Sequence, residues 1–513
     1  MASHCRARSL LSVNSSTYFI GELLLEICSP GRFVQYDERG GRRIDRVGGL
    51  LGCEPVDESA RYGDRVAIPE PYSIEHIPFA ERHGHSRQLL WLWLAANLTI
   101  ADYALGFLPV ALGLPIVPAL LALALGNILG GLVLAWSAAM GPAAGYPQMF
   151  IGRRAFGRVG GYIPAALNWL STAGWFTVNT ILGSFAVQLL LPAVPFPVAA
   201  AGLVVIQTLL VIYGHNLIQA FERYMAAILG VLFAIGAVIA LTHGSAISAW
   251  QPKPVGSTLA LFAIVLAASF SYIMSWSPYA SDYSRYLPEI TSRSYIAIYV
   301  FAGAAVASFL TEVVGMLVAI IAPGASSSIA ALKIAMGGFG VLAVVAVILG
   351  ATTANVLNLY SNTISAKVLD VRLPRWQLAI LGGALGFVVA LVGYQNFTQN
   401  YANFLIVLDY WIMPWLAVVL LDFYVFRHRE PMGFSQAVPV NWNGLLAWVI
   451  GLGVSLFFIS EQLQVFGVKA HGPFAAWFGD ADFGYFVGFL TAGLVYIVLN
   501  RRLARPSDAI VEG

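Results

Sequence analysis

The sequence is poor in charged residues. Of its 513 residues only 11% are charged and 58% are hydrophobic, whereas soluble domains carry roughly 25% charged residues. This shortage excludes an ordinary soluble globular protein and indicates an integral membrane protein. The formal net charge is only +2, and the basic residues lie in short separate segments rather than in one patch. We therefore expect no nucleic-acid partner.

Cysteine and histidine, which could serve catalysis or metal binding, are scarce in the long apolar runs of the sequence. The three cysteines, Cys5, Cys28 and Cys53, precede the first long apolar run and lack metal-ligand spacing, so we interpret them as reduced, incidental thiols. The apolar runs contain no cysteine, and histidines such as His215 and His243 lie at their edges. A membrane-embedded enzyme would need such residues or paired acids inside the membrane. We therefore expect neither enzymatic activity nor a bound cofactor.

Long apolar runs fill most of the remaining sequence. A helix needs about 20 apolar residues to cross the hydrocarbon core of a bilayer, and runs of that length recur from Gln88 onward. We predict an all-α polytopic membrane protein, embedded in the lipid bilayer, with 12 transmembrane helices. They lie at about 89–112, 116–139, 162–191, 195–213, 221–242, 258–279, 295–322, 334–359, 376–394, 402–426, 443–462 and 482–500.

Basic residues in the connecting segments alternate with these spans. Cytosolic loops carry an excess of lysine and arginine, and the loops that follow even-numbered spans hold eleven such residues against three in the opposite loops. The eleven are Arg153, Arg154, Arg158, Arg223, Arg285, Arg293, Lys367, Arg372, Arg375, Arg427 and Arg429; the three are Lys253, Lys333 and Lys469. We predict that both termini are cytoplasmic, in the plasma (inner) membrane.

Two spans are interrupted within the apolar region. The sixth runs without charge from Leu259 and then reaches Trp276 and Pro278, whereas the first carries Thr99 and Asp102 ahead of a glycine and a proline. Lipid offers no partners for freed backbone groups, so a helix breaks at membrane depth only beside protein or a water-filled cavity. Interrupted helices at matching positions of two halves point to a transporter binding site.

The interruptions lie five spans apart, which predicts two five-helix repeats of opposite orientation. A channel would instead need a continuous polar stripe through several spans, and the sequence has none. The predicted parts are a cytosolic, largely irregular tail at 1–88, a first repeat at 89–242, a second repeat at 258–426, two additional helices at 443–500 and a cytosolic tail at 501–513.

Aromatic and amide side chains gather in the third, sixth and eighth spans. Trp175 and Asn179 lie four residues apart and share a helix face; Trp276 precedes the break, and Asn355 lies among small polar residues. Indole rings stack on flat ligands, which contributes ~1–3 kcal/mol per base, and amides pair with base edges. With no basic residue in the spans to hold a carboxylate, these four residues predict a neutral, π-rich substrate. The alternatives are interfacial anchoring for tryptophan and interhelical contacts for asparagine.

Asp102 is the leading candidate for coupling to a cation or proton. A carboxylate within the membrane is costly and is a functional hypothesis by default; the alternative is a structural partner for the broken backbone. Its rivals are Glu312 and Asp409, whereas Asp282 and Arg285 are interpreted as a loop-end ion pair or inner gate. Three hydroxyl residues are assigned to the same coupling site: Thr99, Thr352 and Thr353.

Longer stretches around these residues resemble the nucleobase:cation symporter-1 family, most closely its purine–cytosine permease branch. The resemblance covers about 74–429 and includes GPAAGYPQM at 141–149 and YASDYSRY at 279–286. The other matching stretches are 77–78, 81–82, 91–106, 126–130, 154–157, residue 168, 174–176, 355–361 and 410–415.

This resemblance implies a leucine-transporter-type 5+5 inverted repeat, alternating access and symport of a nucleobase or related heterocycle. It assigns the family's pocket residues to Trp175, Asn179, Trp276 and Asn355. Sodium-coupled members carry hydroxyl residues about one turn or more before the pocket asparagine, where Leu349 and Gly350 stand here, so a proton is favoured over sodium. The prediction is import of cytosine and/or purines; the alternative is another flat heterocycle, such as uracil, hydantoin, allantoin or a vitamin-like compound.

Overall fold

The computed structural model describes residues 62–426, 438–459, 464–465, 468–469, 471–478 and 482–501, apart from the side chains of 396–403, 405–407, 409, 464–465, 468–469 and 478. Most of the two predicted tails, and the side chain of the rival acid Asp409, therefore lie outside the described residues. The chain divides into one unit at 1–63 and another at 64–513, and everything below concerns the second.

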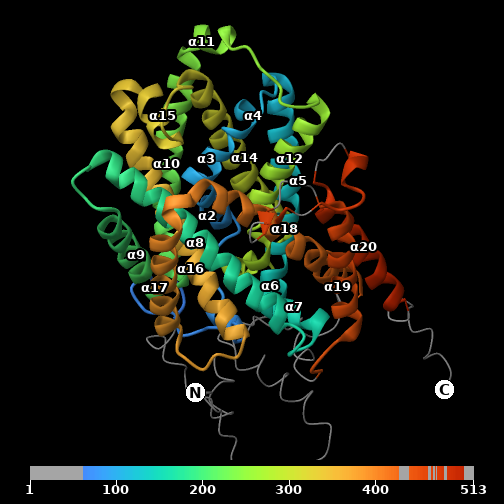
Figure 1. Ribbon diagram of the computed structural model, residues 1–513. Helices are drawn as coiled ribbons and strands as arrows, with labels where there is room; N and C mark the ends of the chain where they lie inside the picture. Colours follow the sequence, from blue (N-terminus) through green and yellow to red (C-terminus); the bar gives the residue numbers. More distant parts are fainter. Residues whose placement is uncertain are drawn as a thin grey trace, which may run out of the picture. The chain divides into compact units, whose positions relative to one another are not determined.

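Long apolar helices make up most of this unit (Figure 1). Eight helical stretches of the described residues are long and apolar enough to cross a membrane, and a bent pair adds a ninth. The eight are α5 (Ile116–Ala138) continued by α6 (Met140–Ala144), α8 (Tyr162–Leu190), α9 (Phe196–Tyr213), α10 (His215–Thr242), α12 (Thr258–Met274) continued by a 3-10 turn (Ser277–Tyr279), α14 (Arg293–Ile321), a 3-10 turn (Gly337–Phe339) continued by α16 (Gly340–Val368), and α17 (Arg375–Gly393).

Three shorter apolar stretches, Tyr410–Phe426, Trp442–Phe458 and Gly484–Leu499, fall on the last three predicted spans. They belong to α18 (Phe397–Leu421) with a π-helical turn (Asp422–Phe426), α19 (Trp442–Ser455) with a 3-10 turn (Leu456–Phe458), and α20 (Gly484–Leu499). The multi-span helical architecture is confirmed, whereas the count of twelve crossing helices stays a prediction.

Several short elements were not expected from hydropathy, because they are too short to give a hydropathy signal. They are α4 (Leu108–Ala111), α7 (Gln148–Phe156), α11 (Gly244–Ala249), α13 (Ser281–Ser284), α15 (Ser328–Ala335) and 3-10 turns at Phe79–Glu81, Tyr394–Asn396 and Ala475–Phe478. The prediction of an all-α chain also missed a small antiparallel hairpin, in which β1 (Gln464–Val465) pairs with β2 (Val468–Lys469).

The predicted break in the first span is present, whereas in the sixth span the α-helix passes into a 3-10 turn within one continuous crossing stretch. The first span consists of α2 (Arg87–Asn97) and α3 (Ile100–Leu105), whose axes are bent by 54°. Thr99 has an extended backbone, and its hydroxyl accepts a hydrogen bond from the backbone nitrogen of Asp102, so it caps α3. In the sixth span α12 ends at Met274, and Pro278 lies in the 3-10 turn that follows. The break in the first span therefore lies at Leu98–Thr99, ahead of its glycine and proline.

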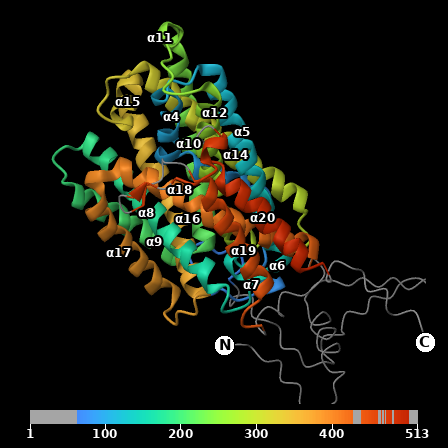
Figure 2. The same cartoon turned by 45° about the vertical axis from the view of Figure 1, so that its right-hand side comes forward.

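The helices of the unit form two groups. We call α2, α3, α5, α12 and α14 the bundle and α8, α9, α16 and α17 the scaffold, because the helices within each group pack on one another. Figures 1 and 2 show the scaffold helices together on one side and α19 with α20 on the other. Small residues permit the close approach in the bundle: a Cβ added at Gly106 would lie 2.0 Å from the carbonyl oxygen of Glu312.

A polar connection holds the loop after α16 against the start of α8. Asp370 accepts hydrogen bonds from Arg158 at 2.9 and 3.0 Å, from Arg153 at 3.1 Å and from the hydroxyl of Tyr162. Partial burial raises the pKa of Asp370, but these hydrogen bonds outweigh it and lower the pKa to about 2.

Asp370→Asn is expected to lower the thermal stability of the purified protein, by roughly 1 kcal/mol once solvent screening is allowed for. Asp370 has a positive φ of 59°, which asparagine tolerates, so the substitution removes the charge without straining the backbone. Because the pKa of the folded state lies below that of the unfolded state, the stabilisation is present above about pH 4 and is lost as the pH falls towards 2. The difference in unfolding midpoint between wild type and variant should thus be equal at pH 6 and pH 8; a difference that disappears within this window would contradict the assignment.

Candidate functional site

Helix α8 carries the first two predicted pocket residues. Trp175 and Asn179 are both buried on its inner face. The amide nitrogen of Asn179 donates to the carbonyl oxygen of Trp175 at 3.1 Å, while its Oδ1 receives no hydrogen bond from the described residues. The ring of Trp175 packs edge-on against Tyr272 at 5.5 Å and against Phe404 at 5.3 Å. This turn of α8 therefore offers an aromatic surface and an unused acceptor.

Trp276 lies between α12 and the 3-10 turn that follows it. Its ring is edge-on to Trp93 of α2 at 5.6 Å and to Tyr279 at 5.5 Å, and its indole nitrogen has no acceptor within the described part of the chain. Trp93 is fully buried and was not among the predicted pocket residues. The available signal was its position four residues before Asn97, on the same face of the interrupted first span.

Asn355 of α16 is fully buried and is held by the scaffold. Its Nδ2 lies within donating distance of the carbonyl oxygen of Phe176 at 2.9 Å, the hydroxyl of Thr180 at 3.0 Å and Oε1 of Gln207 at 3.1 Å. Its Oδ1 has no donor among the described residues. The hypothesis that Asn355 pairs with a base edge therefore has only its oxygen available, since the nitrogen ties α16 to α8 and α9.

These contacts bring the predicted pocket residues to one region beside the break in the first span and the 3-10 turn in the sixth. The amide of Asn355 meets α8 at Phe176 and Thr180. Tyr272 contacts Trp175, and Trp276 follows Tyr272 by one turn. The unused polar groups of this region include two acceptors, on Asn179 and Asn355, and an indole donor, on Trp276. Such a set suits a flat ligand that has both amino and carbonyl or ring-nitrogen groups at its edge.

The three predicted hydroxyl residues make protein contacts. Thr99 shares a hydrogen bond of 2.7 Å with the hydroxyl of Tyr272, which links the broken first span to α12. The Thr352 hydroxyl donates to a carbonyl one turn earlier in its own helix, whereas that of Thr353 donates to the carbonyl oxygen of Ala95 in α2 at 3.1 Å. Thr352 thus fits the alternative of a locally satisfied helix hydroxyl, and Thr353 lies where the scaffold meets the bundle.

Two of the candidate acids are neighbours. Asp102 of α3 and Glu312 of α14 are both fully buried, and each acid is an electrostatic neighbour of the other. They were treated as rivals because the sequence places them on different spans. This proximity follows from Gly106 and Gly315, which let α3 and α14 approach at backbone distance.

The predicted loop-end ion pair of Asp282 with Arg285 requires correction. Arg285 is fully buried and forms an ion pair of 3.0 Å with Glu70, whereas Asp282 accepts a hydrogen bond from the backbone nitrogen of Gln148 at 2.9 Å. Sequence reasoning missed Glu70, because it lies in a stretch without helical periodicity that was assigned to an irregular tail. A carboxylate between two prolines, Pro69 and Pro71, offers no signal of burial by itself.

Glu70 joins the two groups of helices at their ends near the N-terminal segment, residues 64–86. Its carboxylate accepts from Tyr286, which follows α13, at 2.6 Å and from Tyr360 of α16 at 2.9 Å, and it lies 3.6 Å from the guanidinium of Arg375. A Cβ added at Gly214 would lie 2.4 Å from the carboxylate. We call Glu70, Arg285, Tyr286, Tyr360 and Arg375 the Glu70 cluster. It ties the end of the sixth span to the scaffold.

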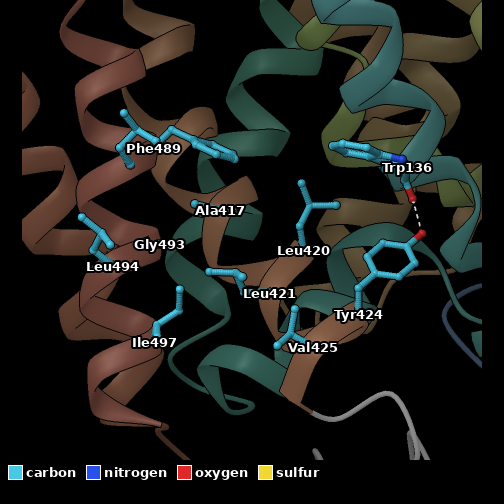
Figure 3. Close-up of a pocket in the computed structure, with 11 residues that line it drawn as sticks. Trp136, Ala417, Leu420, Leu421, Tyr424, Val425, Phe489, Gly493, Leu494 and Ile497 are labelled. Carbon is cyan, nitrogen blue, oxygen red and sulfur yellow. Dashed lines mark hydrogen bonds between the residues drawn. The ribbon is translucent and has the colours of Figure 1, made fainter. Parts of the chain in front are cut away.

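A separate apolar pocket of about 460 Å³ lies between α18, α20 and Trp136 (Figure 3). Figure 3 shows Leu420, Leu421 and Phe489 around it, and the hydroxyl of Tyr424 donates to the carbonyl oxygen of Trp136 at 2.7 Å. None of the predicted pocket residues lines it. Its hydrocarbon lining suits lipid chains and lacks the polar groups that would orient a base.

Comparisons with known proteins agree on one family. A family model described as permeases for cytosine/purines, uracil, thiamine and allantoin matches residues 76–488. A Bacillus subtilis protein named as a purine-cytosine permease, YxlA, is 28% identical over 447 residues, which cover 84% of this chain and 96% of that protein. The purine-cytosine permease fcyB of Emericella nidulans is 27% identical over 500 residues, covering 92% and 93% of the two chains.

A solved structure supplies the fold. Mhp1, a nucleobase-cation-symport-1 family transporter described in a closed conformation with bromovinylhydantoin bound, superposes with a TM-score of 0.68 at 17% identity, over 85% of this chain and 96% of that chain. Identity this low establishes a shared fold and leaves the ligand of this chain to be argued from its own residues.

Proposed function

The chain belongs to the nucleobase:cation symporter-1 family, in its purine–cytosine permease branch, and from this premise we propose that it is a secondary active symporter importing cytosine and/or purine nucleobases by alternating access. It is a multi-pass membrane permease and not an enzyme. We further propose that it resides in the plasma (inner) membrane with both termini cytoplasmic, as the alternation of basic loops predicts.

The observation that supports a nucleobase most directly is the set of unused groups around Trp175 and Trp276. Stacking on indoles needs only a flat π-system, while the free oxygens of Asn179 and Asn355 accept from amino groups and the indole nitrogen of Trp276 donates. Cytosine and adenine present both an exocyclic amino group and ring acceptors. The side chains of these four residues carry no charge, which favours a neutral ligand.

Alternating access is supported by the way the bundle contacts the scaffold. Beyond Trp276 along the chain, Tyr279 donates to Asn358 at 3.0 Å, and Tyr283 bonds with Ser361 at 2.9 Å. The Glu70 cluster follows at the end of the span. These contacts close the path on the side of the N-terminal segment, and their rupture as the bundle rocks would open it. We propose this series as the cytosolic gate.

A proton is favoured over sodium as the coupled cation. The hydroxyls of Thr352 and Thr353 donate to backbone carbonyls, and Leu349 and Gly350 stand more than one turn before Asn355. Asp102 remains the proposed coupling residue, with Thr99 linking it to Tyr272. Apart from this ion, the proposed partners are the substrate and the lipid bilayer.

Another flat heterocycle is the alternative substrate. The family description includes uracil, thiamine and allantoin, and two aromatic rings with two acceptors fit several of these. Uracil, however, lacks an exocyclic amino group to donate to the oxygens of Asn179 and Asn355, so the pocket favours cytosine or adenine.

Uptake of radiolabelled cytosine in a strain that lacks its own permease tests the proposal. We expect saturable uptake that unlabelled adenine and cytosine suppress and an uncoupler abolishes, with no change when sodium is removed. Hypoxanthine, uracil, allantoin and hydantoin serve as competitors, and the strain with an empty vector is the control. If cytosine is not taken up and none of the bases competes, the nucleobase assignment is wrong; uptake that requires sodium would overturn the proton assignment alone.

A further inference from the structure

Two fully buried carboxyl groups lie beside the break in the first span. Asp102 is the third residue of α3, and Glu312 lies in the middle of α14; both have no exposed surface. A Cβ at Gly106 would lie 2.0 Å from the carbonyl oxygen of Glu312, so the two backbones are in direct contact and hold these side chains together. Each carboxyl group interacts with the other.

The described surroundings of the pair contain hydrogen-bonding groups but no cation. Asn127 of α5 donates to Oε2 of Glu312. Oε1 of Glu312 and both carboxylate oxygens of Asp102 receive no hydrogen bond of good geometry from the described residues, although the hydroxyls of Ser269 and Ser308 lie near the pair. No ion pair of the described chain includes either acid. The polar residues that neighbouring elements contribute are Asn97 from α2, Thr99 at the break, Asn127 from α5, Ser269 and Tyr272 from α12, and Ser308 from α14.

Two ionised carboxylates are incompatible with these surroundings. Burying one charge without a partner already costs several kcal/mol, and a second like charge beside it adds repulsion that water does not screen. A proton between the two groups removes the repulsion and the burial of the second charge, because the protonated carboxyl donates to the other one and the single remaining negative charge is spread over the pair.

We propose that Asp102 and Glu312 act together as the carrier of the co-transported proton; this deepens, and rests on, the proposed symport function. In the closed protein the proton lies between the two carboxyl groups as an O–H donor of one to an oxygen of the other. Opening of this region to water hydrates the pair, and the proton leaves to water with no other bond made or broken.

The pair is connected to the proposed substrate pocket. The backbone nitrogen of Asp102 donates to the Thr99 hydroxyl at 3.3 Å, that hydroxyl shares a hydrogen bond of 2.7 Å with Tyr272, and the ring of Tyr272 packs on Trp175 at 5.5 Å. Movement of Trp175 on substrate binding would therefore be transmitted to the break that carries Asp102. This provides a physical route by which proton and substrate could affect each other.

The donor groups favour a proton over sodium at this place. A sodium ion needs several oxygen ligands, whereas Asn127 presents its N–H groups to Glu312 and to a carbonyl of its own helix. A donor that already points at the carboxylate opposes a metal cation but stabilises a carboxylate that shares a proton.

The test compares two modes of transport in proteoliposomes that contain the purified full chain. Exchange of labelled for unlabelled cytosine needs binding and rocking but no net proton movement, whereas accumulation driven by an imposed pH gradient needs coupling. We expect Asp102→Asn and Glu312→Gln to keep the rate of exchange within about threefold of wild type. Gradient-driven accumulation should fall at least about tenfold, because a pair with one amide can no longer take up and release the shared proton. Cytosine-induced proton uptake, read with an enclosed pH dye, should disappear in both variants.

Glu222→Gln is the matched control. Glu222 of α10 is also fully buried, and neither of its carboxylate oxygens has a hydrogen-bond donor within the described residues. If burial of a single acid were enough to cause the loss of coupling, this variant would lose coupling too. We expect instead that it behaves as wild type in both assays. A variant that keeps a normal gel-filtration profile but loses exchange counts against the proposal, because the pair would then serve binding.

The outcomes separate this inference from the proposed function. Absence of cytosine and purine exchange by wild type would overturn the substrate proposal itself. Exchange by wild type without cytosine-induced proton uptake, or full accumulation by either Asp102→Asn or Glu312→Gln, would overturn the role of the pair and leave the transporter assignment intact.

Discussion

Glu70→Gln is expected to open the side of the protein that the N-terminal segment closes. The substitution keeps the size of the side chain but removes the charge that partners Arg285, which has no exposed surface and no second ion-pair partner among the described residues. Loss of one member of a buried pair costs roughly 3–5 kcal/mol. If Arg285 regains water in the open state, this corresponds to a shift of about a hundredfold or more towards that state.

Cysteine labelling can measure this shift. Ser361→Cys places a thiol on α16 where Tyr283 now contacts Ser361 at 2.9 Å, in a background whose three native cysteines are replaced by serine. We expect labelling by a thiol reagent in inside-out vesicles to rise strongly when Glu70→Gln is added, together with a fall in gradient-driven accumulation.

Glu75→Gln is the control for this experiment. Glu75 lies in the same N-terminal segment but is exposed, and its carboxylate accepts only from the backbone nitrogen of Ser73 among the hydrogen bonds described. It should leave the labelling of Ser361→Cys unchanged. Equal labelling in the Glu70→Gln and Glu75→Gln proteins would remove the Glu70 cluster from the gate.

Much of the fold could be predicted because hydropathy reports membrane depth directly. Each crossing helix needs a long apolar run, and the bilayer gives broken backbone no partners, so the interruptions near Thr99 and Trp276 were visible in the sequence. The conformation of residues 64–86 was not predictable, because that segment is fixed by single contacts such as those of Glu70 and by the carbonyl of Pro142, to which Arg82 donates at 2.6 Å. Single contacts of this kind leave no periodic pattern in the sequence, so sequence analysis does not detect them.

The candidate site shows the same division. The residue types of the pocket were indicated by chemistry, since tryptophan and asparagine inside a span need a reason to be there. Their orientation was not: the sequence could not show that the nitrogen of Asn355 is used by Phe176 and Thr180 and only its oxygen remains. Nor could it show that Glu312 and Asp102 meet, because their proximity depends on glycines in two helices far apart in the chain.

Trp276→Ala is expected to weaken substrate binding more than any other single change in the pocket. Removal of one stacking surface costs ~1–3 kcal/mol for a base, which corresponds to a rise in KM of about 5- to 150-fold with a smaller change in maximal rate. Trp276→Phe retains a flat ring but not the indole donor, so it should recover most of the loss for a ligand held by stacking. If phenylalanine recovers nothing, the donor of Trp276 rather than its ring holds the substrate.

Trp136→Ala separates this effect from a general loss of packing. Trp136 lines the apolar pocket of Figure 3 and is 53% exposed in the absence of a bilayer, so the variant loses an indole of equal size outside the predicted site. Its KM should equal that of wild type when uptake is normalised to the amount of protein in the membrane. If KM is unchanged in Trp276→Ala, or rises equally in both variants, the substrate does not bind at Trp276. Only direct contact with the ligand would make the affinity depend on one indole and not on the other.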